Sequence, residues 1–304
     1  MKKVIALLIA DIHLSSTAPV ARSGEPDWYA AQGRVLDQLR TLQRKNGGCP
    51  IVCAGDVFDR WNSSPELINW VATNLSGFPG EIWVIPGQHD LPHHNYDELN
   101  RSAFDTLCFT GRVKQIPPDS GVWLQEYGLD LVGFPWGVEL HPEKEELARG
   151  IRLAVVHRYV WMSGYEYKGA PNDGNIHSIA RRLKGYTHVV FGDNHRGFQL
   201  GSFYNCGCLI PRKSDERKLK PSVGAVFSDG SVVRIPLDCS QDQWLEENDP
   251  RVEIGERIDA ADFLDGLRGL EWDSLNVREW VKRYLDRSEI SQRVRETVLD
   301  ALGE

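Results

Sequence analysis

Buried-strand patterns alternate with amphipathic helix patterns in the first third of the chain. Continuous apolar runs over residues 3–10, 50–54 and 81–85 predict strands. Between them, residues 26–44 and 65–75 carry apolar positions at helical spacing. The order is therefore βαβαβ. This order predicts a parallel or mostly parallel sheet, in which functional groups collect at the carboxyl ends of the strands.

Beyond residue 113 the pattern changes to short β-like runs that are separated by turn residues. We interpret these runs as a second sheet that packs on the first. Residues 228–231, with the sequence SDGS between two apolar runs, predict a β-hairpin. The β-like runs cover residues 122–124, 129–134, 151–156, 188–191 and 223–227.

After about Cys239 the chain becomes polar, and its apolar positions return at helical spacing. We predict helices over residues 259–270, 274–285 and 288–302. The expected organisation has two parts. Residues 1–239 form an α/β domain of two packed mixed β-sheets flanked by helices, and residues 240–304 form a helical C-terminal appendage.

Composition narrows the class of protein. The chain has 304 residues, of which 41% are hydrophobic and 26% charged, as in a soluble folded protein. No segment approaches the roughly 20 apolar residues of a membrane span. The N-terminal MKKVIALLIA resembles a secretory signal, but its apolar run ends directly at Asp11 without a cleavage site, so a buried strand explains it better. The six scattered cysteines favour a reducing cytoplasm over a disulfide scaffold.

The formal net charge is −8, which argues against nonspecific coating of nucleic acid by a basic surface. A nuclease is not excluded by this charge. Divalent metal ions can carry the local positive charge that meets a phosphate, and the acidic ligands that hold them lower the net charge of the chain.

Candidate metal ligands follow five of the predicted strands. Read alone, each histidine is more often a structural or surface residue, and each aspartate is often a turn or helix cap. Five clusters of acid, amide or imidazole groups, each at its own strand end, instead favour one metal site. The clusters are Asp11 with His13, Asp56 with Asp59 and Arg60, Gln88 with His89 and Asp90, His157, and Asp193 with His195.

The ordered set resembles the calcineurin-like metallophosphoesterase superfamily, with its motifs D-x-H, G-D-x-x-D-R, G-N-H-[DE], a lone H and G-H-x-H. Asp11-Ile-His13, residues 55–60 and His157 match these motifs. Two positions depart from them. Gln88 stands in place of Asn, and Asp193 stands in place of the first His of the last motif. The fold that this resemblance implies is an αββα sandwich.

The resemblance also implies two divalent metal ions that share Asp56. Both departures fall on the second ion, which gains oxygen ligands and should favour Mn²⁺, or Mg²⁺, over Zn²⁺. Loss of the second ion is the alternative. The implied ligands are Asp11, His13, Asp56 and His195 for one ion, and Asp56, Gln88, His157 and Asp193 for the other.

Among subfamilies, residues 3–237 resemble most closely the SbcD-type DNA exonuclease subunits and their phage-encoded relatives. Residues 205–208, followed by residues 211–216, resemble the segment where those nucleases read N-P-G-S before a basic stretch and a final hairpin. The resemblance implies DNA as substrate and an SMC-like ATPase of the SbcC type as partner, contacted by the C-terminal appendage. The chain itself has no Gly-rich ATP loop. A homodimer remains open, and the expected location is the cytoplasm, of the host if a phage encodes the protein.

The implied reaction is phosphodiester hydrolysis by a hydroxide that two metal ions hold. His89 would stabilise the transition state or protonate the leaving group, Asp90 would orient it, and Asp59 and Arg60 would support the site. Two alternatives stay open: a phosphodiesterase for a small nucleotide or other phosphoester, and a non-catalytic subunit with an impaired second metal site. Candidate nucleic-acid contacts are Arg60, Arg158, Arg196, Arg212 and Lys213.

Overall fold

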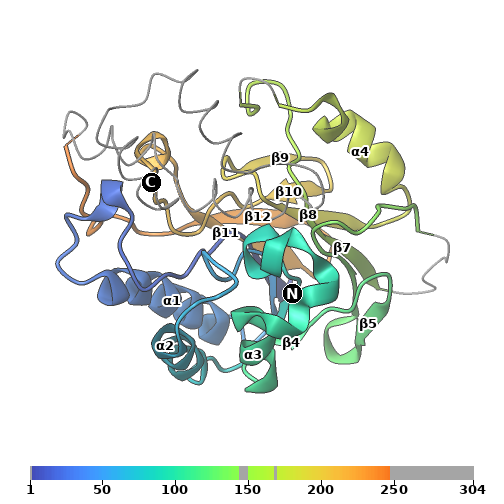
Figure 1. Cartoon of the computed structure of the whole chain (residues 1–304). Helices are drawn as coiled ribbons and strands as arrows, with labels where there is room; N and C mark the ends of the chain where they lie inside the picture. The colour runs from blue at the N-terminus through green and yellow to red at the C-terminus, as the bar shows by residue number, and fades with distance from the viewer. Residues whose placement is uncertain (1, 144–149, 168–169, 247–304) are drawn as a thin grey trace. The chain divides into compact units, whose positions relative to one another are not determined.

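The computed structural model describes residues 2–143, 150–167 and 170–246. These residues form two six-stranded β-sheets with helices around them (Figure 1). The first sheet has the order β12-β11-β1-β2-β3-β4 and the second the order β5-β6-β7-β8-β10-β9. The prediction of two mixed β-sheets flanked by helices is therefore confirmed.

The N-terminal half of the first sheet follows the predicted βαβαβ order. Its strands are β1 (Val4–Ile9), β2 (Ile51–Cys53), β3 (Ile82–Val84) and β4 (Lys114–Gln115), and neighbouring strands run parallel. The connections contain the helices α1 (Trp28–Lys45), α2 (Pro65–Leu75) and α3 (Ala103–Phe109). Side chains cap the first two helices, because Asp27 accepts from the Ala30 N–H and Ser64 from the Leu67 N–H.

The predicted hairpin forms, with strands β11 (Ser222–Phe227) and β12 (Val232–Pro236). Its placement in the second sheet was wrong, because β11 lies antiparallel against β1 in the first sheet, with Leu7 opposite Ala225. Both strands are apolar runs that fit either sheet. The pairing of β11 with β1, at opposite ends of the domain's sequence, decides which sheet the hairpin joins.

The second sheet consists of β5 (Gly121–Leu124), β6 (Leu129–Phe134), β7 (Ile151–His157), β8 (His188–Gly192), β9 (Phe198–Leu200) and β10 (Phe203–Asn205). Strands β6, β7, β8 and β10 run parallel, while β5 and β9 are antiparallel edge strands. Helix α4 (Ile176–Arg182) packs on the outer face of this sheet, where Ile176 and Ile179 join Val156 and Phe191 in one apolar cluster.

The two sheets enclose the central core. Leu8 and Val52 of the first sheet pack with Leu131, Val155 and Val190 of the second. On the other face of the first sheet, α1 and α2 bury Leu36, Leu39 and Val71 against the strands. Strands that are covered on both faces need continuous apolar runs, which explains why the central strands of both sheets read without alternation.

No helix within the described part of the chain is long and apolar enough to cross a bilayer. The three helices predicted after residue 259 lie outside the described residues. The proposed division at residue 239 therefore stays a prediction, because the appendage is described only as far as residue 246.

Candidate metal centre

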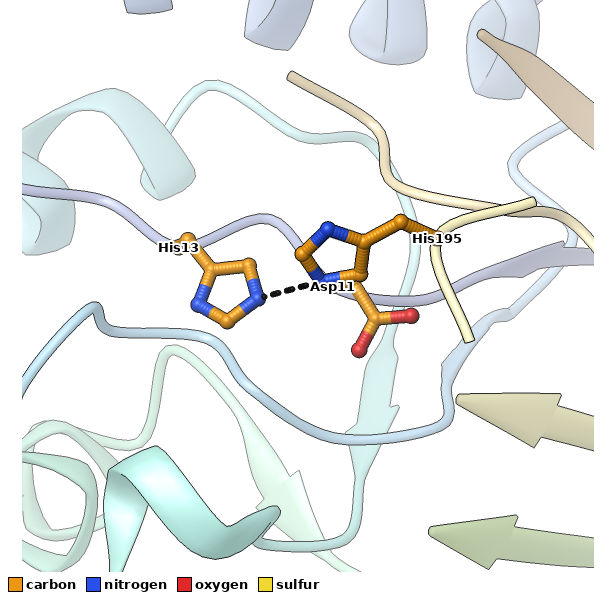
Figure 2. Close-up of side chains that lie close together, drawn as sticks. All are labelled: Asp11, His13 and His195. Carbon is orange, nitrogen blue, oxygen red and sulfur yellow. Dashed lines mark hydrogen bonds between the residues drawn. The ribbon is translucent and has the colours of Figure 1, made fainter. Parts of the chain in front are cut away.

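Asp11, His13 and His195 form a first group of candidate metal ligands. Asp11 and His13 follow β1, and His195 follows β8, so residues 182 or more positions apart meet at one edge of the sandwich. Figure 2 shows the two imidazole rings facing each other beside the Asp11 carboxylate. The Nε2 atoms of His13 and His195 are 3.1 Å apart, and one ligand atom of each residue lies within 4.8 Å of the others.

Asp56, Gln88, His157 and Asp193 form a second group. His157 Nε2 lies 2.5 Å from Gln88 Oε1 and 3.5 Å from Asp56 Oδ2, and Gln88 Nε2 donates to Asp193 Oδ1 over 3.0 Å. The structure thus brings together all seven residues predicted as metal ligands. Asp11 belongs to this region as well, because it forms a ligand cluster with Asp56 and His157 and accepts the Asp193 N–H.

Asp56 connects the two groups. Its Oδ2 atom is buried without a hydrogen-bond partner, and it lies 3.6 Å from His13 Nε2 and 3.5 Å from His157 Nε2. A buried carboxylate oxygen without a partner costs free energy unless something compensates its charge. Divalent cations bind carboxylate and imidazole ligands of this kind. The residues present therefore fit a metal centre with Asp56 between two positions.

The backbone is strained where these ligands lie. Among the described residues, seven residues other than glycine have positive φ, and four of them are Asp11, His13, Asp56 and Asp193. Left-handed backbone costs free energy at non-glycine positions and persists where the surrounding structure enforces it, often at functional sites. The strand-end loops are therefore held in conformations that turn these side chains toward one another.

The glycines of the motifs make this convergence sterically possible. A Cβ atom on Gly87 would collide with the Asp56 carboxylate, and one on Gly55 would collide with the ring of His157. Only glycine allows the loops after β2 and β3 to approach the ligands so closely.

Burial and mutual charge shift the pKa values of the ligands in opposite directions. Burial raises the pKa of Asp11 to about 7 and lowers the pKa of His13 well below its usual range. Burial also acts to raise the pKa of Asp56, but the nearby imidazoles of His157 and His89 hold it at about 2. For His157 burial acts to lower the pKa, and the Asp56 carboxylate overrides it and raises the pKa to about 10. His13 is therefore neutral and Asp56 ionised, which are the forms that coordinate cations, whereas His157 carries a proton that a bound cation would displace.

Glu216 contacts the first group but was missed by the sequence analysis. It lies in the short 3₁₀ helix η7 (Ser214–Glu216), is 4% exposed, and its Oε1 lies 2.5 Å from His195 Nδ1. Its Oε2 accepts the backbone N–H groups of Arg212 and Lys213. A carboxylate that holds one ring nitrogen of a ligand histidine orients the other toward the metal. Through this contact His195 and Glu216, together with Cys208, form a further cluster of potential ligands. Glu216 lies in the charged run of residues 212–220, and no sequence motif distinguishes it from its neighbours.

Arg212 lies inside the molecule rather than on the DNA-facing surface that we predicted. It is 8% exposed, and its guanidinium pairs with the Asp59 carboxylate. Asp59 Oδ1 is also 3.9 Å from His13 Nδ1. Asp59 and Arg212 therefore connect the loop after β2 to the segment before β11. The prediction that Asp59 supports the site is consistent with this position.

The ring of His89 lies beside the first group, with its centroid 4.9 Å from that of His13. Its backbone N–H donates to Asp56 Oδ1 over 3.0 Å. The prediction that Asp90 orients this ring is wrong. His89 Nδ1 donates to the Asp59 carbonyl oxygen, whereas the buried Asp90 carboxylate accepts from the backbone N–H groups of Val57, Phe58 and Gly87. Asp90 therefore ties the loops after β2 and β3 together.

The other predicted nucleic-acid contacts lie at different depths. Arg60, Arg196 and Lys213 are exposed, and Arg158 is half-buried, with one guanidinium nitrogen lacking a partner. Their role as phosphate contacts stays a prediction.

Buried carboxylates and imidazoles gathered at the strand ends of an αββα sandwich are the donor set of a divalent-metal centre. Residues 6–197 match the model of the calcineurin-like phosphoesterase family. The chain therefore belongs to the calcineurin-like phosphoesterase family. A search of curated protein sequences gives no match.

Two solved structures illustrate the likeness. One is the protein TT1561 of Thermus thermophilus, with 12% identity and a TM-score of 0.43, covering 76% of this chain and 97% of that chain. Another crystal structure has 11% identity and a TM-score of 0.42, covering 78% of this chain and 100% of that chain. Family membership rests on the match over residues 6–197.

Proposed function

We propose that this protein is a DNA nuclease that hydrolyses phosphodiester bonds with two divalent ions, Mn²⁺ or Mg²⁺. The observation that carries the proposal is the position of Asp56. Its unpartnered Oδ2 lies within 3.6 Å of a ligand nitrogen in each group, so one carboxylate can serve two cations. Oxygen ligands from Gln88 and Asp193 favour hard cations at the second position.

The residues of the chain have separate roles in this mechanism. When bound, two divalent ions supply an activated water as nucleophile and the positive charge that a phosphoester transition state requires. Asp11, His13 and His195 would hold one cation, and Gln88, His157 and Asp193 the other. His89 is anchored through Nδ1 on the Asp59 carbonyl. The doubly protonated ring would keep its Nδ1 proton on that carbonyl and donate its Nε2 proton to the leaving oxygen, becoming neutral.

The assignment of DNA as substrate is supported by the resemblance of residues 3–237 to SbcD-type nucleases. Exposed basic side chains beside the candidate centre, among them Arg196 and Lys213, fit a phosphate backbone. The further expectation of an SMC-like ATPase partner concerns the segment after residue 239, and binding of such a partner to chains with and without residues 247–304 would test it.

The function can be tested with purified protein that is loaded with Mn²⁺. We expect degradation of linear DNA, and loss of this activity in His89→Ala and in His157→Ala. Cyclic nucleotides and bis(p-nitrophenyl) phosphate serve as comparison substrates. Turnover of these small diesters without turnover of DNA would replace the nuclease proposal with a small-phosphoester function. Equal activity of wild type and both variants would overturn the site assignment.

A further inference from the structure

A pocket of about 330 Å³ opens beside the first ligand group. His195 forms part of its wall, so the pocket adjoins the candidate metal centre at one ligand. Most of its lining comes from three segments, residues 164–165, residues 195–197 after β8 and residues 218–221 before β11, and Cys206, Cys208 and Arg234 complete it. None of the residues that the mechanism uses, apart from His195, lines this pocket.

The lining of the pocket is strongly basic. Arg196, Lys218, Lys220 and Arg234 contribute to it, and no acidic residue does so among the described residues. This is unusual for a chain with a net charge of −8. Such a concentration of cations raises the local concentration of anions and favours phosphate groups.

The four basic side chains differ in how firmly the surrounding structure holds them. Arg234 is fixed, because its guanidinium donates to the carbonyl oxygens of Cys206, Asn205 and Phe198 and to Ser222 Oγ. It supplies a permanent positive charge. Arg196, Lys218 and Lys220 are exposed, so their side chains can follow a ligand without losing buried contacts.

Tyr165 adds an aromatic face to the same pocket. Its ring is 37% exposed and lies 6.1 Å, centroid to centroid, from the ring of Phe198. Exposed aromatic rings next to cationic side chains are the combination that binds unpaired nucleotides, because bases stack on the ring while phosphates meet the cations.

We propose that this pocket, lined by Tyr165, Arg196, Lys218 and Lys220, holds a nucleotide of an unpaired DNA strand next to the phosphate that is cleaved. The proposal rests on the proposed nuclease function and adds a strand-binding subsite to it. A small diester would reach the metal centre without entering the pocket. The pocket therefore makes the protein prefer a polynucleotide to a small phosphoester.

The first experiment measures binding of a fluorescein-labelled single-stranded oligodeoxynucleotide by anisotropy at several salt concentrations. In Lys218→Gln/Lys220→Gln, two lost phosphate contacts should reduce the slope of log affinity against log salt by about 1.4, since single strands release about 0.7 counterions per contact. Tyr165→Ala should weaken binding about fivefold or more, whereas Tyr165→Phe, which keeps the aromatic ring, should bind as wild type does. The matched control is Arg44→Gln/Lys45→Gln, in the last turn of α1 at the opposite ends of the strands.

The second experiment compares turnover of two substrates in the full-length protein loaded with Mn²⁺. The lysine double variant should raise KM for the oligonucleotide and leave kcat/KM for bis(p-nitrophenyl) phosphate unchanged. An unchanged oligonucleotide KM, or an equal loss on both substrates, overturns the subsite while the nuclease function stands. Wild-type protein that cleaves only the small diester overturns the nuclease function itself. Metal content, measured in parallel, should be the same in all variants.

Discussion

The two groups of candidate ligands differ in how their side chains are held. In the first group, Glu216 holds His195 Nδ1 from outside, and a single hydrogen bond joins two candidate ligand atoms, the Nε2 atoms of His195 and His13. In the second group, the candidate ligand atoms bond to one another, because Gln88 contacts both His157 and Asp193. A cation would therefore replace one internal hydrogen bond in the first group, between His13 and His195, but two in the second group.

This difference predicts that the two positions bind metal with different affinity. Preorganised ligands lose little conformational freedom on binding. Ligands that already satisfy one another give up hydrogen bonds, each worth about 1 kcal/mol net, before they coordinate. We therefore expect the first position to fill at lower Mn²⁺ concentration than the second. The following variants test this comparison.

The largest effect should come from Asp56→Asn, which removes the charge that both groups share. We expect metal content to fall from two divalent ions per chain to one or none, as measured by inductively coupled plasma mass spectrometry. Turnover of bis(p-nitrophenyl) phosphate should fall on the order of 10³-fold, because metal ions stabilise such transition states by several kcal/mol. Asp97→Asn, at an exposed position, is the control. Retention of two ions would show that Asp56 does not connect the groups.

His89→Ala should separate catalysis from metal binding. If His89 donates a proton and binds no metal, kcat should fall by about 10²- to 10⁴-fold while both ions stay bound. Stopped assays of DNA cleavage and metal analysis of the same sample measure the two quantities. His177→Ala, at an exposed position of α4, controls for loss of a histidine. Loss of an ion in His89→Ala would make this residue a ligand instead.

Glu216→Gln should weaken the first group alone. Gln keeps the shape of the side chain but not its charge, so His195 loses the carboxylate that orients it. Removal of such a partner usually lowers metal affinity by about 10- to 100-fold. Titration calorimetry with Mn²⁺ should show the tighter step weakened and the other unchanged. Glu126→Gln, an exposed variant, should leave both steps unchanged, and circular dichroism should show that both variants fold. Equal weakening of both steps would contradict the comparison.

The smallest effect should come from Asp193→His, which restores the residue type that the superfamily motif has at this position. A nitrogen ligand in place of an oxygen ligand should raise the affinity for Zn²⁺ relative to Mn²⁺ at the second position only. The lost Gln88 to Asp193 hydrogen bond should lower the free energy of unfolding by about 1 kcal/mol in the metal-free protein. Competition titrations and urea unfolding measure these changes. An unchanged metal preference would show that Asp193 does not coordinate.

Local patterns predicted most elements of the fold correctly. Helix α2 and strand β6 have the predicted bounds, and β1, β2, β3, β7 and β8 differ from theirs only at the ends. The short helices α3 and α4 and the short strands β4, β9 and β10 were not predicted, because segments of two to seven residues carry too few apolar positions to show a period. The hairpin β11 and β12 was found but assigned to the wrong sheet, since strand pairing across 216 or more positions leaves no local signal.

The candidate ligands were predictable for a different reason. Each follows a strand, and parallel strands bring their carboxyl ends to one edge, so order along the chain implies proximity. The seven predicted ligands do converge in the structure. Asp90 was misinterpreted because sequence adjacency to His89 suggested contact, whereas the 3₁₀ turn directs its carboxylate onto three backbone N–H groups.

The sequence by itself determined the strand order of the N-terminal region, the family and the set of candidate metal ligands, because these depend on local period and on motifs at strand ends. Only the tertiary structure decided that Glu216 orients His195, that Arg212 pairs with Asp59 instead of facing a phosphate, and that Lys218 and Lys220 line a pocket beside the centre. These contacts join loops that are 21 to 153 residues apart. No local pattern encodes such contacts, because they depend on how the whole sandwich packs.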